Sequence, residues 1–388
     1  MDRASCLPDS GTHRRFISRS SRDGGQLIRE SRAAVALKCP AHDRKYPKPM
    51  KRLTFLFAGL AVAALSFSDD VRAKSKGDFQ SWLAGVRAEA LTKGIRPDLV
   101  DRLLMDVQPN RRVIKRDRSQ AEFKLTLAIY RKRVVTPTNI AVGRKKAAKH
   151  LDLLKAVAAK YGVQPRFILA IWGIETRYGA VEANVPLVSS LATLAYDARR
   201  SKFFRKQLFD TLQMVNMGYI GADSLFGSWA GAMGQPQFMP SSYLAFAQDF
   251  DGDGRRDIWK NEGDVFASIA NYLAEHGWND NLTWGRQVTA PAPLIASLGK
   301  PSRRAAPGCR ARTSGTKTLS EWQTLGVRRA DGTDLPTRNL SAALVLPDGP
   351  DGEAYIVYRN YAAIMAYNCA HLYAVTVGTL ADNIGRVK

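Results

Sequence analysis

The feature that most constrains the fold is a change of sequence pattern at about residue 285. Upstream, apolar residues recur at helical spacing, as in "FQSWLAGVRAEA" from Phe79. Residues 285–358 are instead rich in Thr, Val, Gly and Pro and carry Asp-Gly pairs, which are typical of short strands joined by tight turns. We therefore expect a mainly α (α+β) fold, in which residues 74–284 and 359–388 are helical and 285–358 form a small β-rich insert.

Glycine and proline set the expected helix boundaries. The sequence predicts one helix over residues 144–160 that ends at Gly162. It predicts the next helix from about Pro165, because proline fits the first turn of a helix. Gly179 is expected to terminate this second helix.

The first 73 residues have a composition of their own. Residues 1–49 show no sustained hydrophobic period, whereas 50–73 combine Lys51 and Arg52 with a short apolar run and small residues at a cleavage site. This pattern is typical of a secretory signal peptide, and we interpret residues 1–49 as a misassigned start or disordered extension. We expect a periplasmic protein with no stable membrane anchor, because the apolar run is short and no cysteine follows it.

The charge of the chain limits its partners without choosing one. The 388 residues carry a formal net charge of +23 at pH 7, and a basic protein is drawn to polyanions. We find no zinc-finger spacing, recognition-helix signature or aromatic RNA-binding motif, so no nucleic-acid partner is expected. An exported protein meets anionic cell-wall peptides and lipid surfaces instead.

Four cysteines divide between the two parts of the chain. Cys6 and Cys39 precede the signal peptide, whereas Cys309 and Cys369 follow it. In an oxidising compartment the latter two either form one disulfide or remain unrelated thiols. The sequence does not decide between these alternatives.

The stretch "FILAIWGIETRYG" places one carboxylate, Glu175, in an apolar run. Ile171 and Trp172 lie one helical turn before it, so the carboxyl shares a face with apolar bulk. Burial and the negative end of the helix dipole both oppose ionisation and raise the pKa of a carboxyl. A protonated carboxyl in a cleft is what a general acid needs. The alternative is a structural ion pair with Arg177 or a more distant arginine.

A second motif, "GSWAGAMGQPQFMPSSY", begins at Gly227. Its glycines let backbone approach a ligand closely, Ser228 and Gln237 offer hydrogen-bonding groups, and Phe238 and Tyr243 offer aromatic faces for a sugar. The alternative is a tightly packed turn before a helix.

These two motifs belong to a set of six ordered blocks covering residues 78–388. The other four are "LATLAYDARR", "DFDGDGRRDIW", "SIANYLAEHGW" and "YNCAHLYA". Together they make the chain resemble the lytic murein transglycosylases of the soluble and membrane-bound B type, which have a lysozyme-like helical core. One departure is Gly-Gln-Pro-Gln at 234–237, where some relatives have Gly-Tyr-Gly-Gln; this puts the local contact at 235–236 in doubt.

The resemblance implies specific roles for residues of this chain. Glu175 matches the catalytic acid and base, and Arg199 and Arg200 match a basic pair at the glycan cleft. The positions matching residues that line the cleft are Ser228, Gln237, Tyr272, Tyr367 and Tyr373.

The resemblance also implies chemistry with a single enzyme carboxylate. Ordinary glycosidases use two, but the nearest downstream candidates, Glu182 and Asp197, lie in no comparable motif. The family cleaves the bond between N-acetylmuramic acid and N-acetylglucosamine without water and leaves a 1,6-anhydro ring. No cofactor is expected for catalysis. Peptidoglycan glycan strands are the expected binding partner, and cell-wall synthases or amidases are possible protein partners. The alternatives are a hydrolytic muramidase on the same fold and an inactive peptidoglycan-binding protein.

"DFDGDGRRDIW" has the spacing of a calcium loop. Side chains of Asp249, Asp251 and Asp253 and the carbonyl of Arg255 fall at ligand positions, but position 12 is a lysine. The resemblance implies a longer loop closed by Asp264, directly before a helical run, and a structural Ca²⁺. The alternative is an Asp-Gly turn whose carboxylates cap a helix and pair with neighbouring arginines.

Overall fold

The structure is a computed structural model, and the expected signal peptide at 50–73 lies outside the residues that it describes. The described residues are 79–119, 125–182, 184–298 and 301–387. All of the described residues belong to one compact unit, and all that follows concerns this unit. Among the described residues, no helix is both long and apolar enough to cross a membrane.

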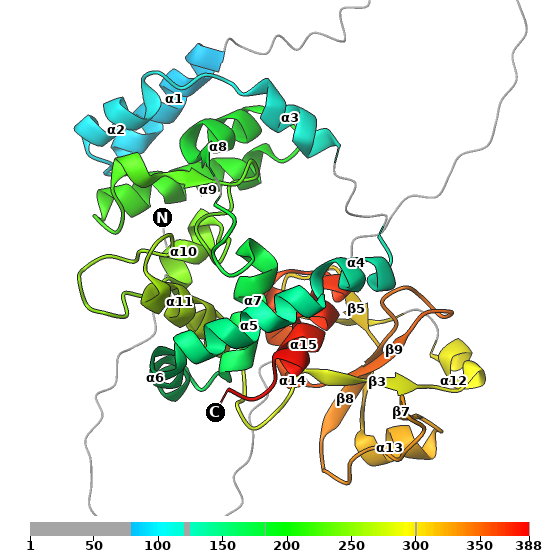
Figure 1. Ribbon diagram of the computed structural model, residues 1–388. Helices are drawn as coiled ribbons and strands as arrows, with labels where there is room; N and C mark the ends of the chain where they lie inside the picture. The colour runs from blue at the N-terminus through cyan, green and yellow to red at the C-terminus, as the bar shows by residue number, and fades with distance from the viewer. Residues whose placement is uncertain (1–78, 120–124, 183, 299–300, 388) are drawn as a thin grey trace, which may run out of the picture. The chain divides into compact units, whose positions relative to one another are not determined.

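A group of helices from two parts of the chain packs together (Figure 1). Gly94, with φ of +77°, ends the first helix, and Pro97 occupies the first turn of the second. The Asn110 side chain caps the third by accepting from the backbone N–H groups of Arg112 and Val113. The helices of this group are α1 (Phe79–Thr92), α2 (Pro97–Leu104), α3 (Arg111–Arg118), α8 (Leu187–Tyr196) and α9 (Ser201–Asn216).

The prediction of one continuous helix over residues 144–160 is wrong, because the structure divides this stretch into two helices at His150. There φ is −109°, and the imidazole ring packs edge-on against the rings of Trp172 and Phe266. Packing of this side chain overrides the strong local helix propensity. Gly162 does end the second piece, with φ of +64°. The helices here are α4 (Leu127–Val134), α5 (Pro137–Lys149), α6 (Leu151–Tyr161) and α7 (Pro165–Thr176).

The C-terminal helix lies beside α7, α5 and α4, so it brings the end of the chain against the helix that carries Glu175 (Figure 1). Nine of its fourteen residues are buried, which is why most of this stretch is apolar. The remaining helices of this part are α10 (Pro240–Phe246), α11 (Glu262–Glu275), α14 (Arg359–Tyr367) and α15 (His371–Ile384), with a short 3₁₀ turn η3 (Ala222–Ser224).

An antiparallel sheet forms between residues 285 and 357, in the stretch expected to be β-rich. Its strand order is β6-β8-β9-β3-β7. The strands are β3 (Gly285–Thr289), β6 (Thr316–Thr318), β7 (Arg328–Arg329), β8 (Ser341–Val345) and β9 (Ala354–Val357). Two short helices, α12 (Ala292–Ser297) and α13 (Leu319–Thr324), and a small hairpin of β4 (Arg303–Arg304) and β5 (Arg312–Thr313) accompany them.

The sheet is buried on both faces. Along β9, Ile356 belongs to a small core of the insert that contains Trp322, whereas Tyr355 and Val357 belong to the main helical core. Successive side chains of a strand point to opposite faces, so the insert is joined to the helices by one face of its sheet. The expected mainly helical fold with a small β-rich part is confirmed.

Cys309 and Cys369 form a disulfide, with Cα atoms 5.4 Å apart. This decides the alternative that the sequence left open. The bond joins the loop of the β4–β5 hairpin to the junction between α14 and α15.

Candidate active site

Helix α7 carries Glu175 in its last turn. Gln164 precedes the helix and Pro165 occupies its first turn, as the sequence predicts. The helix ends earlier than expected, however, because Arg177 already adopts the left-handed conformation, with φ of +52°. The prediction that Gly179 supplies the terminating residue is therefore wrong.

Left-handed backbone at non-glycine residues is concentrated in the two motifs. Within the described ranges, Arg177, Tyr178 and Gln237 are the non-glycine residues with positive φ. Such residues cost energy and often occur at functional sites. Gly173 makes the conformation at Tyr178 possible, because a Cβ there would lie 2.5 Å from the Tyr178 ring.

The Glu175 carboxyl is partly buried and accepts a hydrogen bond of 2.6 Å from the Tyr373 hydroxyl. Burial raises the pKa of Glu175 to about 7, against the opposing effect of this hydrogen bond. Within the described residues Glu175 forms no ion pair, and Arg177 is exposed. The expected protonated acid is thus favoured by the structure over the ion pair that the sequence left open.

A row of aromatic rings extends from Tyr373. The Tyr367 ring stacks at 6.4 Å from Tyr373, Tyr272 lies 4.8 Å from Tyr367, and Phe238 lies 5.7 Å from Tyr367. The Tyr272 hydroxyl donates to the carbonyl of Ala366 at 2.8 Å. Burial raises the pKa of Tyr272 to about 12 and that of Tyr367 and Tyr373 well above the usual range. These hydroxyls therefore stay protonated and act as donors.

The glycine-rich motif is a folded loop that reaches this row. Ser228 Oγ accepts from the backbone N–H groups of Ala230 and Ala232, at 3.3 and 3.0 Å. The Gln237 side chain donates to the Gly234 carbonyl at 2.8 Å. Both side chains hold the loop's shape and are partly exposed. The roles in glycan binding that we expect for them remain predictions.

Gln235 has a role that the sequence alone did not reveal. Its side-chain oxygen accepts from Trp172 Nε1 at 2.6 Å, and its side-chain nitrogen donates to the Trp259 carbonyl at 2.8 Å. Its backbone carbonyl accepts from Thr176 Oγ1 at 3.0 Å. The glutamine that departs from the family pattern at this position therefore fastens the loop to α7.

Pro236 completes the connection. Its carbonyl accepts a hydrogen bond of 2.7 Å from the Tyr367 hydroxyl. A proline carbonyl has both lone pairs available although the residue has no N–H. Gln235 and Pro236 thus make hydrogen bonds within the protein to Trp172, Trp259, Thr176 and Tyr367.

The aspartate loop gathers three of the predicted ligands. Carboxylate oxygens of Asp249, Asp251 and Asp264 lie within 4.8 Å of one another. Asp264 is fully buried and accepts from the backbone N–H groups of Phe250 and Asp257, both at 2.7 Å. Burial, with a smaller effect from Asp251 and Asp249, raises the pKa of Asp264 to about 6.

Asp253 lies outside this group of three, and its carboxylate accepts from the backbone N–H of Arg255 at 2.8 Å. The ligand role expected for the Asp253 side chain remains a prediction. The ligand role of the Arg255 carbonyl remains a prediction. In the described ranges, no ion pair to a lysine or arginine neutralises Asp249, Asp251 or Asp264.

Comparison with known proteins identifies the family. Residues 78–382 match the family model described as "Transglycosylase SLT domain". The chain belongs to the transglycosylase SLT family.

Individual relatives agree with this membership. Over 150 residues, 38% of this chain, the sequence is 41% identical to membrane-bound lytic murein transglycosylase B of Escherichia coli strain K12, and the alignment spans only 41% of that relative. SltB3 from Pseudomonas aeruginosa, crystallised with NAG-anhNAM-pentapeptide, has 39% identity and a TM-score of 0.73 over 80% of both chains. The Escherichia coli lytic transglycosylase Slt35, crystallised with calcium, has 28% identity and a TM-score of 0.65 over 78% of this chain and 92% of its own.

The arginine pair expected at the glycan cleft of this family member is bound to Asp117 on α3. Arg199 Nε donates to the Asp117 carboxylate at 2.9 Å, and Arg200 pairs with the other carboxylate oxygen. The Asp117 side chain is 5% exposed, whereas those of the arginines are 50% and 38% exposed. Both arginines thus fasten α3 to the loop between α8 and α9, and their glycan contact remains a prediction.

Neither candidate for a second carboxylate contributes to the raised pKa of Glu175. Glu182 is exposed. Asp197 pairs with Arg118 at 3.0 Å. The structure therefore places one acid, three tyrosines and the glycine-rich loop together.

Proposed function

We propose that this chain is a lytic transglycosylase that cleaves the β-1,4 bond between N-acetylmuramic acid and N-acetylglucosamine of peptidoglycan. The observation that carries the proposal is Glu175, whose pKa of about 7 keeps a substantial fraction protonated at neutral pH. Family membership supports the substrate class. The anhydro fragment in the crystal structure of the Pseudomonas aeruginosa relative supports the product type.

In the proposed reaction Glu175 acts twice. Its proton passes to the glycosidic oxygen as the bond from that oxygen to the muramic C1 breaks. The substrate's acetamido carbonyl stabilises the positive charge that develops at C1. The Glu175 carboxylate then takes the proton of the muramic C6 hydroxyl while O6 bonds to C1, which gives the 1,6-anhydro ring. No water and no cofactor enter, and Glu175 ends protonated as it began.

The surroundings of Glu175 suit both steps. The half-buried carboxyl gives a proton readily, and the Tyr373 hydroxyl, 2.6 Å away, stabilises the carboxylate after proton transfer. An intramolecular C6 hydroxyl has a high effective concentration, so a second enzyme carboxylate is unnecessary. In the aromatic row, Phe238 and Tyr272 are buried and pack against Tyr367, whose partly exposed ring offers an apolar face to a sugar.

Product analysis separates this proposal from its alternatives. Purified peptidoglycan is incubated with the protein, and the released fragments are weighed by mass spectrometry. Anhydro-muropeptides are expected; reducing-end products would instead indicate a hydrolytic muramidase, and no release an inactive peptidoglycan-binding protein. Glu175→Gln should lose at least a thousandfold in rate and still bind sacculi. Glu182→Gln, an exposed control, should keep wild-type activity.

Export to the periplasm is part of the proposal, because the substrate lies outside the cytoplasmic membrane. The signal peptide expected at residues 50–73 predicts that the mature protein begins at Lys74. N-terminal sequencing of the protein from a periplasmic extract tests this. An intact protein that begins upstream of Met50 would contradict it.

We also propose a structural Ca²⁺ at Asp249, Asp251 and Asp264. Three converging carboxylates without a basic partner in the described residues are the hard oxygen donors that Ca²⁺ prefers. The calcium in the crystal structure of Slt35 supports this assignment. Titration calorimetry with Ca²⁺ after chelator treatment should detect one site per chain.

A further inference from the structure

The junction between α14 and α15 carries two of the site tyrosines. Tyr367 is the last residue of α14 and Tyr373 lies in the first turn of α15. Tyr367 donates to the Pro236 carbonyl at 2.7 Å and Tyr373 to Glu175 at 2.6 Å. A shift of residues 368–370 would therefore disturb both contacts.

The local hydrogen bonds of the junction come from its backbone: the Asn368 N–H donates to the Ile364 carbonyl at 3.1 Å and the Ala370 N–H to the Asn368 carbonyl at 2.8 Å. Asn368 and Cys369 are exposed, and both Asn368 and Ala370 have extended backbone. Helix α15 begins without a side-chain cap. Any further restraint on this segment has to come from another part of the chain.

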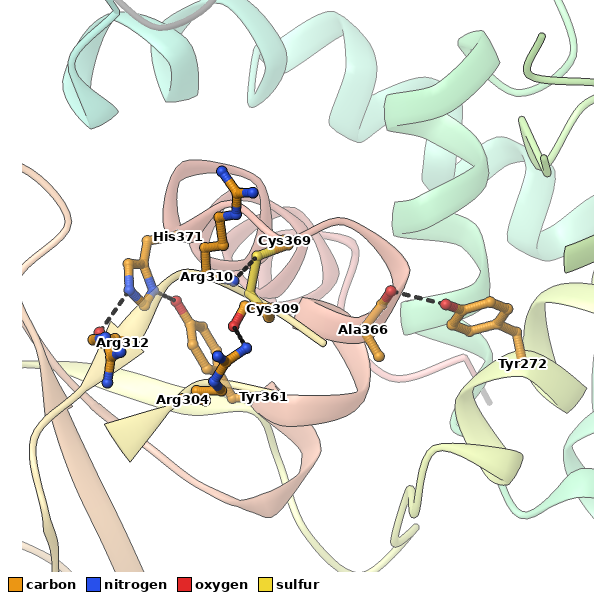
Figure 2. Close-up of a disulfide and its surroundings, with 9 residues drawn as sticks. All are labelled: Tyr272, Arg304, Cys309, Arg310, Arg312, Tyr361, Ala366, Cys369 and His371. Carbon is orange, nitrogen blue, oxygen red and sulfur yellow. Dashed lines mark hydrogen bonds between the residues drawn. A yellow bond between two sulfur atoms is a disulfide. The ribbon is translucent and has the colours of Figure 1, made fainter. Parts of the chain in front are cut away.

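A disulfide joins the hairpin loop of the insert to this junction, as Figure 2 shows. Cys369 is bonded to Cys309, which is only 3% exposed and belongs to the main core together with Ala305 and Ala306. The backbone N–H of Arg310 donates to Cys369 Sγ at 3.2 Å. The exposed end of the disulfide is thus anchored through its buried end.

His371, the first residue of α15, makes a second connection to the insert. Its Nδ1 lies 2.8 Å from the Tyr361 hydroxyl and its Nε2 lies 2.9 Å from the Arg312 carbonyl (Figure 2). Burial lowers the pKa of His371, so the ring is neutral. Because a carbonyl only accepts, Nε2 carries the proton and Nδ1 accepts from Tyr361. This pair of bonds orients the start of α15 but does not reach Cys369 itself.

We propose that the Cys309–Cys369 disulfide is a positioning element of the active site, which holds the α14–α15 junction so that Tyr373 stays on Glu175 and Tyr367 on the glycine-rich loop. The inference rests on the proposed role of Glu175. It assigns the β-rich insert a part in catalysis through the disulfide, although Cys309 and Cys369 touch no substrate.

The expected consequence follows from the groups around Glu175. Within the described residues, four tyrosines face the cluster of Glu175, Tyr367 and Tyr373: Tyr373 on α15, Tyr367 on α14, Tyr272 on α11 and Tyr130 on α4. Arg177, at the end of α7 itself, is exposed. Of these, Tyr373 lowers the pKa of Glu175. A loosened junction weakens that hydrogen bond, so burial acts unopposed and the pKa of Glu175 rises.

The test compares three variants of the full chain with the wild type. Cys309→Ala/Cys369→Ala removes the disulfide, and Tyr373→Phe removes the hydroxyl directly. Leu319→Ala is the control, because Leu319 lies in the insert's own core and its truncation destabilises the insert without touching the junction. The measurement is anhydro-product formation against pH, well below the melting temperature of every variant.

The cysteine pair variant should lose roughly ten- to hundredfold in kcat, the range for a slightly misplaced catalytic group. Its activity should also persist to higher pH than that of the wild type, as for Tyr373→Phe. Leu319→Ala should melt lower and keep the wild-type pH profile. A cysteine pair variant with a wild-type pH profile, whatever its stability, overturns the proposal. Should that variant not fold, the same profile is measured on folded wild type after reduction, since the Cys369 side is exposed.

A readout without activity separates this inference from the proposed function. ¹³C NMR of labelled glutamate follows the Glu175 carboxyl against pH, and Glu175→Gln assigns its signal. An upward shift of the Glu175 pKa on loss of the disulfide supports the positioning role even where no anhydro product forms. An unchanged titration refutes it even where the protein proves to be a lytic transglycosylase.

Discussion

Replacing Glu175 by glutamine should stabilise the protein in a pH-dependent way. The wild-type carboxyl is partly buried among apolar neighbours, and burial raises its pKa from an ordinary 4.5 to about 7. Glutamine has nearly the same shape and does not ionise. Its carbonyl oxygen can still accept the hydrogen bond from Tyr373.

The magnitude and sign follow from proton linkage. Below pH 4.5 the carboxyl is protonated in both the folded and the unfolded chain, so its stability contribution is fully present. Between 4.5 and about 7 the unfolded chain ionises while the folded chain keeps its proton, and the wild type loses stability as the pH rises. The total loss is about 3 kcal/mol. Glu175→Gln avoids it, so its advantage over the wild type should grow by that amount between pH 4 and pH 8.

Urea unfolding followed by tryptophan fluorescence at pH 4, 6 and 8 measures the difference. Other titrating groups cancel because they are common to both proteins. Glu182→Gln is the matched control, since the same substitution at an exposed site should leave the difference nearly independent of pH. A Glu175→Gln advantage that stays constant from pH 4 to pH 8 would refute the claim that burial sets the pKa of this acid.

Three further substitutions test other parts of the site. Gly179→Ala should cost roughly 1–3 kcal/mol in urea unfolding and reduce activity, because φ is +79° and the new Cβ would lie 2.5 Å from Gln235 Oε1. Calcium at a hundred times its Kd should stabilise the wild type by about 2.7 kcal/mol in thermal unfolding, and Asp264→Asn should abolish that response. Asp117→Ala should lower the free energy of unfolding by about 2 kcal/mol and leave the pH profile of activity unchanged. This cost is smaller than for breaking a fully buried ion pair, because the two arginines that Asp117 binds are half-exposed.

Much of the fold follows from local pattern, because apolar periodicity and turn residues act over a few positions. The β-rich pattern after residue 285 coincides with the five-stranded sheet, although the short helices α12 and α13 also lie in this stretch. Packing between distant segments does not follow: the kink at His150 depends on rings contributed by Trp172 and Phe266, far along the chain. The pairing of two cysteines with a sequence separation of 60 likewise requires the folded arrangement.

The site divides in the same way. The resemblance singled out Glu175, Tyr272, Tyr367 and Tyr373, and the structure brings these four side chains together, while their roles remain predictions. Gln235 could not be predicted, since its role is a set of contacts to Trp172, Thr176 and Trp259 that no spacing rule describes. Its one sequence signal is the departure from the family pattern, which marks the position without revealing the contact.

Helix α7 ends directly after the turn that carries Glu175. Glycine at 179 is the residue that a sequence rule selects as the terminator, but a helix continued to that point would add a turn after Glu175. The structure ends the helix at Thr176 by forcing Arg177 and Tyr178 into the left-handed region, at a cost on the order of 1–3 kcal/mol each. The Tyr178 ring, buried over Gly173 with its hydroxyl bonded to the Asn139 carbonyl at 2.9 Å, stabilises that conformation. The strained residues therefore directly follow the turn whose carboxyl accepts the hydrogen bond from Tyr373 of α15.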